Sequence, residues 1–394
     1  MVKINSQETA FIYLKFDQLQ ITENFIDNET LHTIQKNIKK YIQNSLLELQ
    51  IPFTNIKQLN SEDFVIMTKK SIVVKNKNLF ISKLRNFQTL VKEKLFDMEQ
   101  LIHFQVFLLI SITYNGEHRF ESAKIGIKKL LRSKNDFIVA NNLFMKQKEK
   151  ISKNIKILNT VKEAIKNSSV IVYLQPIIDN KTKKTVKYES LLRIKDQQNN
   201  ILLPKEFLNI AKRGKCYHQL TQNVLERSFL LVEKYDKKIS INLSVKDMES
   251  QQIKKDIYQL LKRYKKHTHK ITFELLEDER ISDLKGVMTF LNRVKDYGVK
   301  IAIDDFGKGF SNFERILYYK PDIIKIDGLL IKDIDKNDYA YSIVKTIVNF
   351  AKEQGILTVA EFVENEKIYG CVKKMGVDFS QGFYFGKPAL LTKG

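Results

Sequence analysis

The sequence predicts an α/β protein of two domains, in which a smaller α+β domain precedes a TIM-like (β/α)8 barrel. Its 394 residues are enough for two or three domains. At 43% hydrophobic, with 25 Phe and 16 Tyr, the chain can fill large cores. After about residue 168, strand-like runs alternate with amphipathic stretches of helical length, which is typical of such a barrel. An open doubly wound sheet is the alternative, but the two halves show no reversal of strand order.

A helix at about 144–166 is expected to connect the two domains. This segment contains neither Gly nor Pro, and Ile151, Ile155 and Leu158 recur at helical spacing. It divides the chain into the smaller α+β domain and the barrel. The expected domain ranges are 1–150 and 151–394.

The expected barrel strands are short runs rich in branched and aromatic residues. They lie at 170–178, 186–194, 238–244, 270–277, 299–305, 322–327, 357–363 and 378–385. Helices are expected between most of them, among others at 217–235, 246–265, 280–297 and 336–354. In barrels of this kind the catalytic groups lie at the C-terminal ends of the strands. Polar residues at those ends are therefore the candidates for a functional site.

Cysteine content and hydropathy limit the classes of protein that fit. Cys216 and Cys371 are far apart and form no CxxC, which excludes a disulfide framework and a cysteine zinc site and fits a reducing compartment. No signal peptide opens the sequence, and the longest apolar run, 104–112, is far too short to span a membrane. We expect that run to be a buried strand, and the protein to be cytoplasmic with no membrane span.

The net charge of +22 raises nucleic acid or an anionic membrane as a partner. The distribution of the charge argues against this interpretation. Residues 1–150 hold 23 Lys and Arg against 15 Asp and Glu, and the rest of the chain holds 44 against 30. The excess follows chain length, and the densest basic stretch, 261–270, is expected to be a solvated helix end. A basic nucleic-acid-binding protein remains the second alternative, and no nucleic-acid partner is expected.

Polar side chains end one expected barrel strand after another. In the segment IAIDDFGKGFSNF, Asp304 and Asp305 stand side by side, where like charges repel. Strand alternation directs only Asp304 into the barrel, so Asp305 must reach the site from the start of the following loop. The polar strand-end residues are Glu189, Asn242, Glu274, Asp304, Asp305, Lys325, Glu361 and Gln381.

Five carboxylates at one barrel mouth repel one another unless cations neutralise them. Oxygen ligands without thiolates suit Mg²⁺ or Mn²⁺ and not zinc. Adjacent aspartates can hold two metal ions a few ångströms apart, which is an arrangement used for phosphodiester cleavage. The strand ends therefore predict a two-metal site.

Over about residues 168–390 the sequence resembles the EAL-domain phosphodiesterases, which linearise the bacterial messenger cyclic di-GMP. The motif that names the family corresponds to YESLLR at 188–193, with Ser190 in place of Ala. The other matching segments are QPI (175–177), INLS (241–244), FELLE (273–277), DDFGKGFSNF (304–313), DIIKID (322–327), AEFVE (360–364) and QGFYFGKP (381–388). The resemblance implies a signalling enzyme that hydrolyses cyclic di-GMP to linear pGpG with Mg²⁺ or Mn²⁺, and a possible homodimer through the barrel.

The resemblance also implies a role for each site residue. Asp304 would bridge the two metal ions, and Asp305 and Glu361 would complete the second. Lys325 would orient the attacking water and offset charge that develops on the phosphate. The implied metal ligands are Glu189, Asn242, Glu274, Asp304, Asp305 and Glu361. The implied catalytic residues are Glu189, Asp305, Lys325 and Glu361.

Further residues would contact the ligand or support the site. The guanidinium of Arg193 would hold a phosphate through directed hydrogen bonds. Gln175 and Gln381 would also contact the ligand. Glu277 would brace the loop that the aspartate pair opens, and Glu364 would provide structural support.

Three residues near the expected site depart from the family pattern. Lys308 stands where a small residue is usual, which affects loop closure or dimer contacts. Leu276 replaces a Thr, and Phe362 replaces a Gly. None of the three removes an expected metal ligand, which favours an active enzyme. The alternative is a catalytically inactive receptor that binds cyclic di-GMP and signals to a protein partner.

Residues 1–150 resemble, more weakly, a degenerate GGDEF domain. The segment Asn60-Ser61-Glu62-Asp63-Phe64 stands in place of the GGDEF motif, so both glycines are lost and a nucleotide cannot approach the backbone closely. Lys15 stands where that family has a metal-binding Asp. We therefore expect a regulatory or dimerising domain without cyclase activity. An unrelated α+β sensory domain is the alternative.

Overall fold

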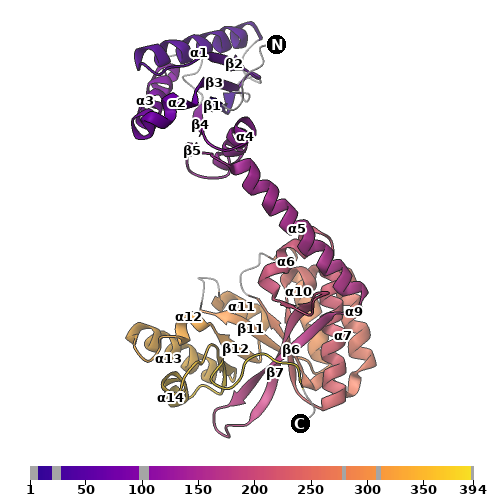
Figure 1. The fold of residues 1–394 in the computed structure, drawn as a ribbon. Coiled ribbons are helices and arrows are strands. Elements are labelled where there is room, and N and C mark those ends of the chain that lie inside the picture. The colour runs from indigo at the N-terminus through magenta and orange to yellow at the C-terminus, as the bar shows by residue number, and fades with distance from the viewer. Residues whose placement is uncertain (1–7, 20–27, 97–105, 277–280, 308–311, 392–394) are drawn as a thin grey trace. The chain divides into compact units, whose positions relative to one another are not determined.

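The structure is a computed structural model that describes residues 8–19, 28–96, 106–276, 281–307 and 312–391. It contains two compact units, Met1–Lys153 and Asn154–Gly394. The boundary between them falls within helix α5 (Leu143–Lys166), where the sequence predicts a connecting helix (Figure 1). Within the described residues, no helix has both the length and the apolar character that a membrane span requires.

The described strands of the first unit form one five-stranded sheet in the order β2-β3-β1-β4-β5. Strand β1 lies at its centre and pairs antiparallel with β3 and β4, while β5 adds parallel to β4. The order β1-α1-β2-β3-α3-β4 is a βαββαβ arrangement. The strands are β1 (Thr9–Asp17), β2 (Asn55–Gln58), β3 (Asp63–Lys69), β4 (Phe107–Thr113) and β5 (Phe137–Val139). The helices are α1 (Asn28–Glu48), α2 (Lys70–Lys75), α3 (Lys77–Phe96) and α4 (Arg119–Leu130).

Helices cover both faces of this sheet, because its central strand is apolar on both sides. Ile12 and Leu14 of β1 belong to the core shared with α1 and α3. Phe11 and Tyr13, which point the other way, pack in a smaller core with α4. The apolar run at 104–112 forms most of β4, so the prediction of a buried strand is confirmed for its described part.

In the second unit, eight of the described strands close into a barrel (Figure 1). Around the ring the order is β6-β14-β13-β12-β11-β10-β9-β7, and β7 pairs with β6 to complete it. Strand β8 (Ile201–Leu202) adds outside the ring against β7. The barrel strands are β6 (Val170–Asp179), β7 (Thr185–Lys195), β9 (Ile239–Leu243), β10 (Ile271–Leu275), β11 (Lys300–Phe306), β12 (Ile323–Ile326), β13 (Leu357–Ala360) and β14 (Phe379–Gln381).

The barrel of eight strands is confirmed, but one strand departs from the (β/α)8 pattern. Strand β6 runs antiparallel to both of its neighbours, β7 and β14. The reason is the short connection between β6 and β7, which has room for a hairpin turn but not for the crossover that parallel strands require.

Helices fill the other connections of the barrel and cover its outside. The stretch 246–265, predicted as one helix, contains two, because the hydroxyl of Ser250 accepts a hydrogen bond from the backbone N–H of Ile253 and starts a new helix. The helices are α6 (Pro204–Arg213), α7 (Tyr217–Tyr235), α8 (Val245–Glu249), α9 (Gln251–Arg263), the 3₁₀ turn η3 (Lys265–Lys270), α10 (Leu284–Asp296), α11 (Asn312–Tyr319), α12 (Gly328–Ile331), α13 (Asp338–Glu353) and α14 (Glu366–Met375).

A buried apolar cluster lies in the barrel interior beneath some of the polar strand ends. Ile177, Ala302, Ile323 and Val359 form one buried cluster. Ala302 and Ile323 each stand two residues before a predicted site residue of the same strand and so share its face, and Val359 stands two before Glu361, which directly follows β13. Part of the layer beneath the predicted site is therefore apolar.

Candidate functional site

Lys325 of β12 lies at the centre of the predicted site and is 1% exposed. Its Nζ is 2.8 Å from Glu274 Oε2, Asp304 Oδ1 and Glu361 Oε1, and 3.4 Å from Glu189 Oε2. These four carboxylates come from or directly follow four other strands, so the closure of the barrel brings them together. An ammonium group carries only three protons and one charge, so it cannot neutralise four carboxylates.

Burial makes the ionised form of most of these carboxylates unfavourable. It raises the pKa of Glu274 to about 7, in spite of the attraction of Lys325. It also raises the pKa of Asp304, and that of Glu361 well above its usual range, with the neighbouring carboxylates adding to the effect. The pKa of Lys325 is raised well above its ordinary value, since the surrounding carboxylates outweigh the cost of its burial. The site is thus short of positive charge.

Glu189 of β7 is the member of this group whose ionised form is stabilised. Burial opposes its ionisation, but Lys325 and two amide donors outweigh burial and lower its pKa. Asn242 Nδ2 donates to Glu189 Oε1 at 2.8 Å, and Gln381 Nε2 donates to Glu189 Oε2 at 2.6 Å. Gln381 Nε2 also lies 3.2 Å from Oε1 of Gln175. The predicted amide residues therefore converge on Glu189.

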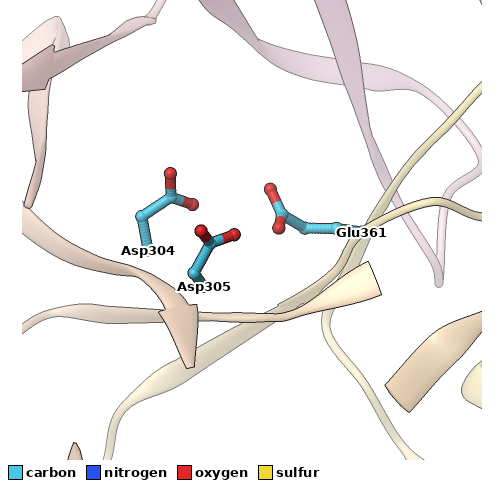
Figure 2. A group of neighbouring side chains, drawn as sticks. All are labelled: Asp304, Asp305 and Glu361. Carbon is cyan, nitrogen blue, oxygen red and sulfur yellow. The ribbon is translucent and has the colours of Figure 1, made fainter. Parts of the chain in front are cut away.

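The aspartate pair reaches the site through an irregularity in β11. The register of β11 against β12 shifts between Ile303 and Phe306. Asp305, inside this interval, has a left-handed backbone with φ 54°, which Asp tolerates better than most residues. Asp305 therefore reaches the site from a bulge within the strand, and the prediction that it does so from the following loop is wrong. Figure 2 shows the carboxylates of Asp304, Asp305 and Glu361 turned toward one another.

The donor set fits divalent cations that prefer oxygen. One ligand atom from each of Asp304, Asp305 and Glu361 lies within 4.8 Å of the others. Among the residues that the structure describes, this is the one group of three or more acidic, His or Cys side chains so arranged. All of its donors are carboxylate oxygens, which are suitable ligands for Mg²⁺ and Mn²⁺. Cations here would supply the positive charge that Lys325 alone does not.

A cavity of about 270 Å³ opens directly over the carboxylates. Its base is polar, and its remaining wall includes exposed apolar side chains. The lining residues are Gln175, Glu189, Leu191, Asp305, Glu361, Phe362, Glu364, Gln381, Gly382 and Phe383. We call this space the first cavity.

A second cavity of about 230 Å³ lies between β7, β9 and helices α6 and α7. It shares Leu191 with the first cavity and is lined by Asn242 and Leu276, two residues that the sequence analysis singled out. Most of its wall is apolar. The two cavities are therefore neighbours at Leu191, and the first of them contains the site carboxylates in its lining.

Several predicted residues lie apart from the carboxylate group or outside the described residues. Arg193 is 9% exposed, lies with Cζ 5.5 Å from the ring centre of Tyr173, and donates to the carbonyl of Leu192. Burial lowers the pKa of Arg193, although the nearby Glu189 charge favours its charged form. Glu277 and Lys308 lie outside the described residues.

Sequence reasoning missed a second lysine inside the barrel. Lys187 is 9% exposed, and its Nζ donates to Thr272 Oγ1 at 3.1 Å. Burial lowers the pKa of Lys187 to about 8. Strand alternation could have found it, because Lys187 stands two residues before Glu189 and Thr272 two before Glu274.

The first unit contains a smaller charged group at the predicted degenerate motif. Lys15 Nζ lies 2.5 Å from Glu62 Oε2 and 3.9 Å from Asp63 Oδ1. Asn60 Oδ1 accepts hydrogen bonds from the backbone N–H groups of Glu62 and Asp63, which fixes the turn between β2 and β3. The lysine that replaces an expected metal-binding Asp is thus paired with acidic residues of the motif.

Known proteins match the barrel part of the chain. The EAL domain family matches residues 158–388, more than half of the chain. The chain is 32% identical over 246 residues to the "Probable cyclic di-GMP phosphodiesterase PdeA" of Escherichia coli K12, covering 61% of this chain and 33% of that protein. It is 30% identical over 239 residues to "Cyclic di-GMP phosphodiesterase PdeF" of the same organism, covering 59% and 32%. The matches thus span about a third of the length of these relatives.

A solved structure agrees with the assignment of the fold. The crystal structure of an EAL domain protein from Listeria monocytogenes EGD-e has 28% sequence identity to this chain and a TM-score of 0.54. The match covers 59% of this chain and 93% of that one. With the family match and the gathered site residues, this comparison leads to one conclusion: the chain belongs to the EAL domain family.

Proposed function

We propose that this chain is a metal-dependent phosphodiesterase that hydrolyses cyclic di-GMP to linear pGpG. The observation that carries the proposal is the group of four carboxylates around Lys325, with Asp305 beside them. The names of the two relatives support the same substrate.

The carboxylate group is proposed to hold two Mg²⁺ or Mn²⁺ ions. Divalent cations bound there would supply Lewis-acid activation for the attack of water on the phosphodiester. The first would be held by Glu189, Asn242, Glu274 and Asp304, and the second by Asp304, Asp305 and Glu361. Support comes from the proximity of Asp304, Asp305 and Glu361 and from the surplus of negative charge in a buried site.

The protein side chains are proposed to orient the reactants. Lys325 is held by four carboxylates, so its ammonium would exchange one of these contacts, as the carboxylates turn to the metal ions, to hold a water molecule and offset charge on the phosphate. Gln381 and Asn242 keep Glu189 ionised and fix its orientation. Arg193 is proposed to bind a phosphate, which it can do while Nη1 keeps its hydrogen bond to the carbonyl of Leu192, because a guanidinium has five N–H donors.

The two cavities support a ligand with two bases. Both are lined by Leu191, and the first also contains site carboxylates in its lining, while the second contains Asn242. A cyclic dinucleotide has two bases joined by two phosphodiester bonds, so one base can enter each cavity while a phosphate faces the carboxylates. Gln175 and Gln381 are proposed to contact the ligand in the first cavity.

A turnover assay tests the proposed activity directly. The purified chain is incubated with cyclic di-GMP and Mg²⁺ or Mn²⁺, and products are separated by chromatography. We expect pGpG to accumulate, and a chelator to stop its formation. Binding of cyclic di-GMP without any product under either metal would contradict the enzyme and support the alternative of an inactive receptor.

The first unit is proposed to be a degenerate GGDEF-like regulatory domain. Its βαββαβ arrangement and the position of residues 60–64 at the turn before and into β3 support this proposal. Since Lys15 occupies the place of an expected metal ligand, we expect no conversion of GTP to cyclic di-GMP with any metal. The detection of that product from the full chain would contradict the proposal.

The proposed setting is the cytoplasm, with a homodimer through the barrel as a prediction for the assembly. Cys216 and Cys371 are both free thiols, which fits a reducing compartment. Sedimentation of the full chain with and without cyclic di-GMP measures the oligomeric state.

A further inference from the structure

Phe362 has a backbone conformation that bulky side chains rarely adopt. Its φ is 51°, in the left-handed region where an aromatic residue is strained. Hydrogen bonds on both sides hold it there: the N–H of Glu361 donates to the carbonyl of Ile326 at 3.3 Å, and that of Val363 donates to the carbonyl of Gln381 at 3.0 Å. This strain follows directly after a site carboxylate, and backbone strain of this kind concentrates at functional sites.

The ring of Phe362 is held against a glycine and remains exposed. A Cβ on Gly328 would lie 2.2 Å from Cδ2 of Phe362, so the ring fits only because residue 328 lacks a side chain. Phe362 is nevertheless 60% exposed, and Phe383, which also lines the first cavity, is 57% exposed. Exposure of apolar area is unfavourable in water. Phe362 thus bears strain and exposure together, and packing among the described residues does not explain both.

The first cavity combines this aromatic wall with a polar base. Its volume of about 270 Å³ is slightly below the roughly 300–1,000 Å³ of pockets that enclose drug-sized ligands, so it suits one part of a dinucleotide. Aromatic rings at the mouth of a polar cavity are suited to a planar nucleobase. The face of the nucleobase stacks on the ring, while the phosphate of the nucleotide turns to the charged floor of the cavity.

We propose that the ring of Phe362 is a stacking platform for one purine base of the cyclic dinucleotide, an inference that rests on the proposed function. Stacking uses the flat face of the base, so it is independent of the phosphodiester bond that breaks. The platform therefore contributes equally to the affinity for substrate and for linear product. It raises affinity without taking part in the chemical step, and Phe362 is a binding residue and not a catalytic one.

Three single variants separate the flat ring from bulk and from strain. Phe362→Gly removes the ring and relieves the left-handed backbone, so we expect the protein to melt at the same or a higher temperature. Its KM for cyclic di-GMP and its inhibition constant for pGpG should both rise about tenfold, with kcat within about twofold. Phe362→Leu, which keeps apolar bulk, should show the same loss of affinity. Phe362→Tyr, which keeps an aromatic ring, should keep the affinity of the unaltered chain.

A double variant tests the position of the ring without removing residue 362. Gly328→Ala should push the ring aside and raise KM, whereas adding it to Phe362→Gly should have no further effect, because the clash is gone. Calorimetry with cyclic di-GMP and Ca²⁺ reads the same affinities in the absence of turnover, so the platform is tested separately from hydrolysis. Unchanged affinities in Phe362→Gly overturn the platform. An unchanged affinity with a change from dimer to monomer also overturns it, and shows that the ring contacts a second copy.

Discussion

Each unit of the chain places a lysine among carboxylates, but the balance of charge differs. In the barrel, Lys325 contacts four carboxylates, and Asp305 lies beside them. In the first unit, Lys15 pairs with Glu62 and lies near Asp63. The pKa of Lys15 is raised, because its acidic neighbours outweigh its burial. The barrel site thus needs further cations, whereas in the smaller site the ammonium of Lys15 supplies most of the positive charge that the carboxylates need.

The charge balance distinguishes an acidic site that binds metal from one that does not. The informative quantity is the buried charge left after internal pairing. In the barrel, burial first and the neighbouring carboxylates second raise the pKa values of Glu274, Asp304 and Glu361. In the first unit, a lysine in place of an acidic ligand removes most of the surplus, and with it the reason to bind a cation.

The largest expected effect comes from Glu189→Gln in the barrel. The change keeps the shape of the side chain but removes the charge of a proposed ligand and catalytic residue. We expect turnover of cyclic di-GMP to fall at least about 100-fold, since the loss of such a charge costs several kcal/mol in the transition state. Glu353→Gln, an exposed position on α13, serves as the control and should be unchanged. More than about a tenth of normal turnover in Glu189→Gln would refute the role of Glu189.

The aspartate pair provides the next test, because its two members differ in their proposed share of the metal ions. Asp304→Asn should weaken the binding of both metal ions, and so lower both the affinity for cyclic di-GMP and the turnover. Asp305→Asn should reduce turnover to a similar extent but keep binding of cyclic di-GMP within about tenfold, or about 1.4 kcal/mol. Calorimetry in Ca²⁺ and product chromatography in Mg²⁺ measure the two effects. Near-normal cleavage by Asp305→Asn would show that Asp305 only shapes the bulge.

The surplus charge in the barrel also predicts a dependence of stability on pH. The folded pKa of Glu274, about 7, lies above its ordinary 4.5, so its stabilising contribution is complete below about 4.5 and is lost as the pH rises through about 7. For the metal-free protein we expect a loss on the order of 3 kcal/mol in the free energy of unfolding between pH 4.5 and 8. Glu189, whose folded pKa is lowered, contributes in the opposite sense at acidic pH.

Denaturant unfolding at several pH values checks this dependence. Glu274→Gln, which cannot ionise, should reduce the fall in stability, and saturating Mg²⁺ or Mn²⁺ should reduce it in the unaltered chain. If neither the variant nor the metal changes the fall of the free energy of unfolding with pH, the charge of the barrel carboxylates is compensated in some other way.

The smallest expected effect is in the first unit. Lys15→Met leaves Glu62 and Asp63 without their ammonium partner, and we expect a loss of about 1 kcal/mol in local stability. Lys15→Arg keeps the charge and is the control. Hydrogen exchange of the amides of β1 and β3 measures the local stability of this unit separately from that of the barrel. Mg²⁺ should protect these strands in Lys15→Met but not in the unaltered chain, and equal protection in both would contradict the comparison.

Much of the barrel could be predicted from the sequence, because its strands carry a strong local signal. Their apolar runs end in polar residues, and the closure of a barrel brings those ends together whatever the details of pairing. Lys325 and its four carboxylate partners were found in this way. The antiparallel direction of β6 was missed, because it depends on the length of one connection and not on the strand pattern.

The features that sequence reasoning missed depend on irregular backbone or on contacts between distant segments. The bulge that brings Asp305 into the site depends on the register of β11 against β12. The fit of Phe362 against Gly328 joins the segment after β13 to the start of α12, and no sequence spacing encodes their proximity. The replacement of Gly by Phe362 was visible in the sequence, but its left-handed backbone was not.

A titration of the metal-free chain with Mn²⁺, followed by calorimetry, tests the central claim most directly. The claim is that the barrel carries a surplus of negative charge that binds two divalent cations, whereas the first unit binds none. We predict two Mn²⁺ ions per chain, one ion in Asp305→Asn and weakened binding of both in Asp304→Asn, with no change in Lys15→Arg. Absence of binding, or two ions whose affinities are unchanged in Asp304→Asn, would contradict the account.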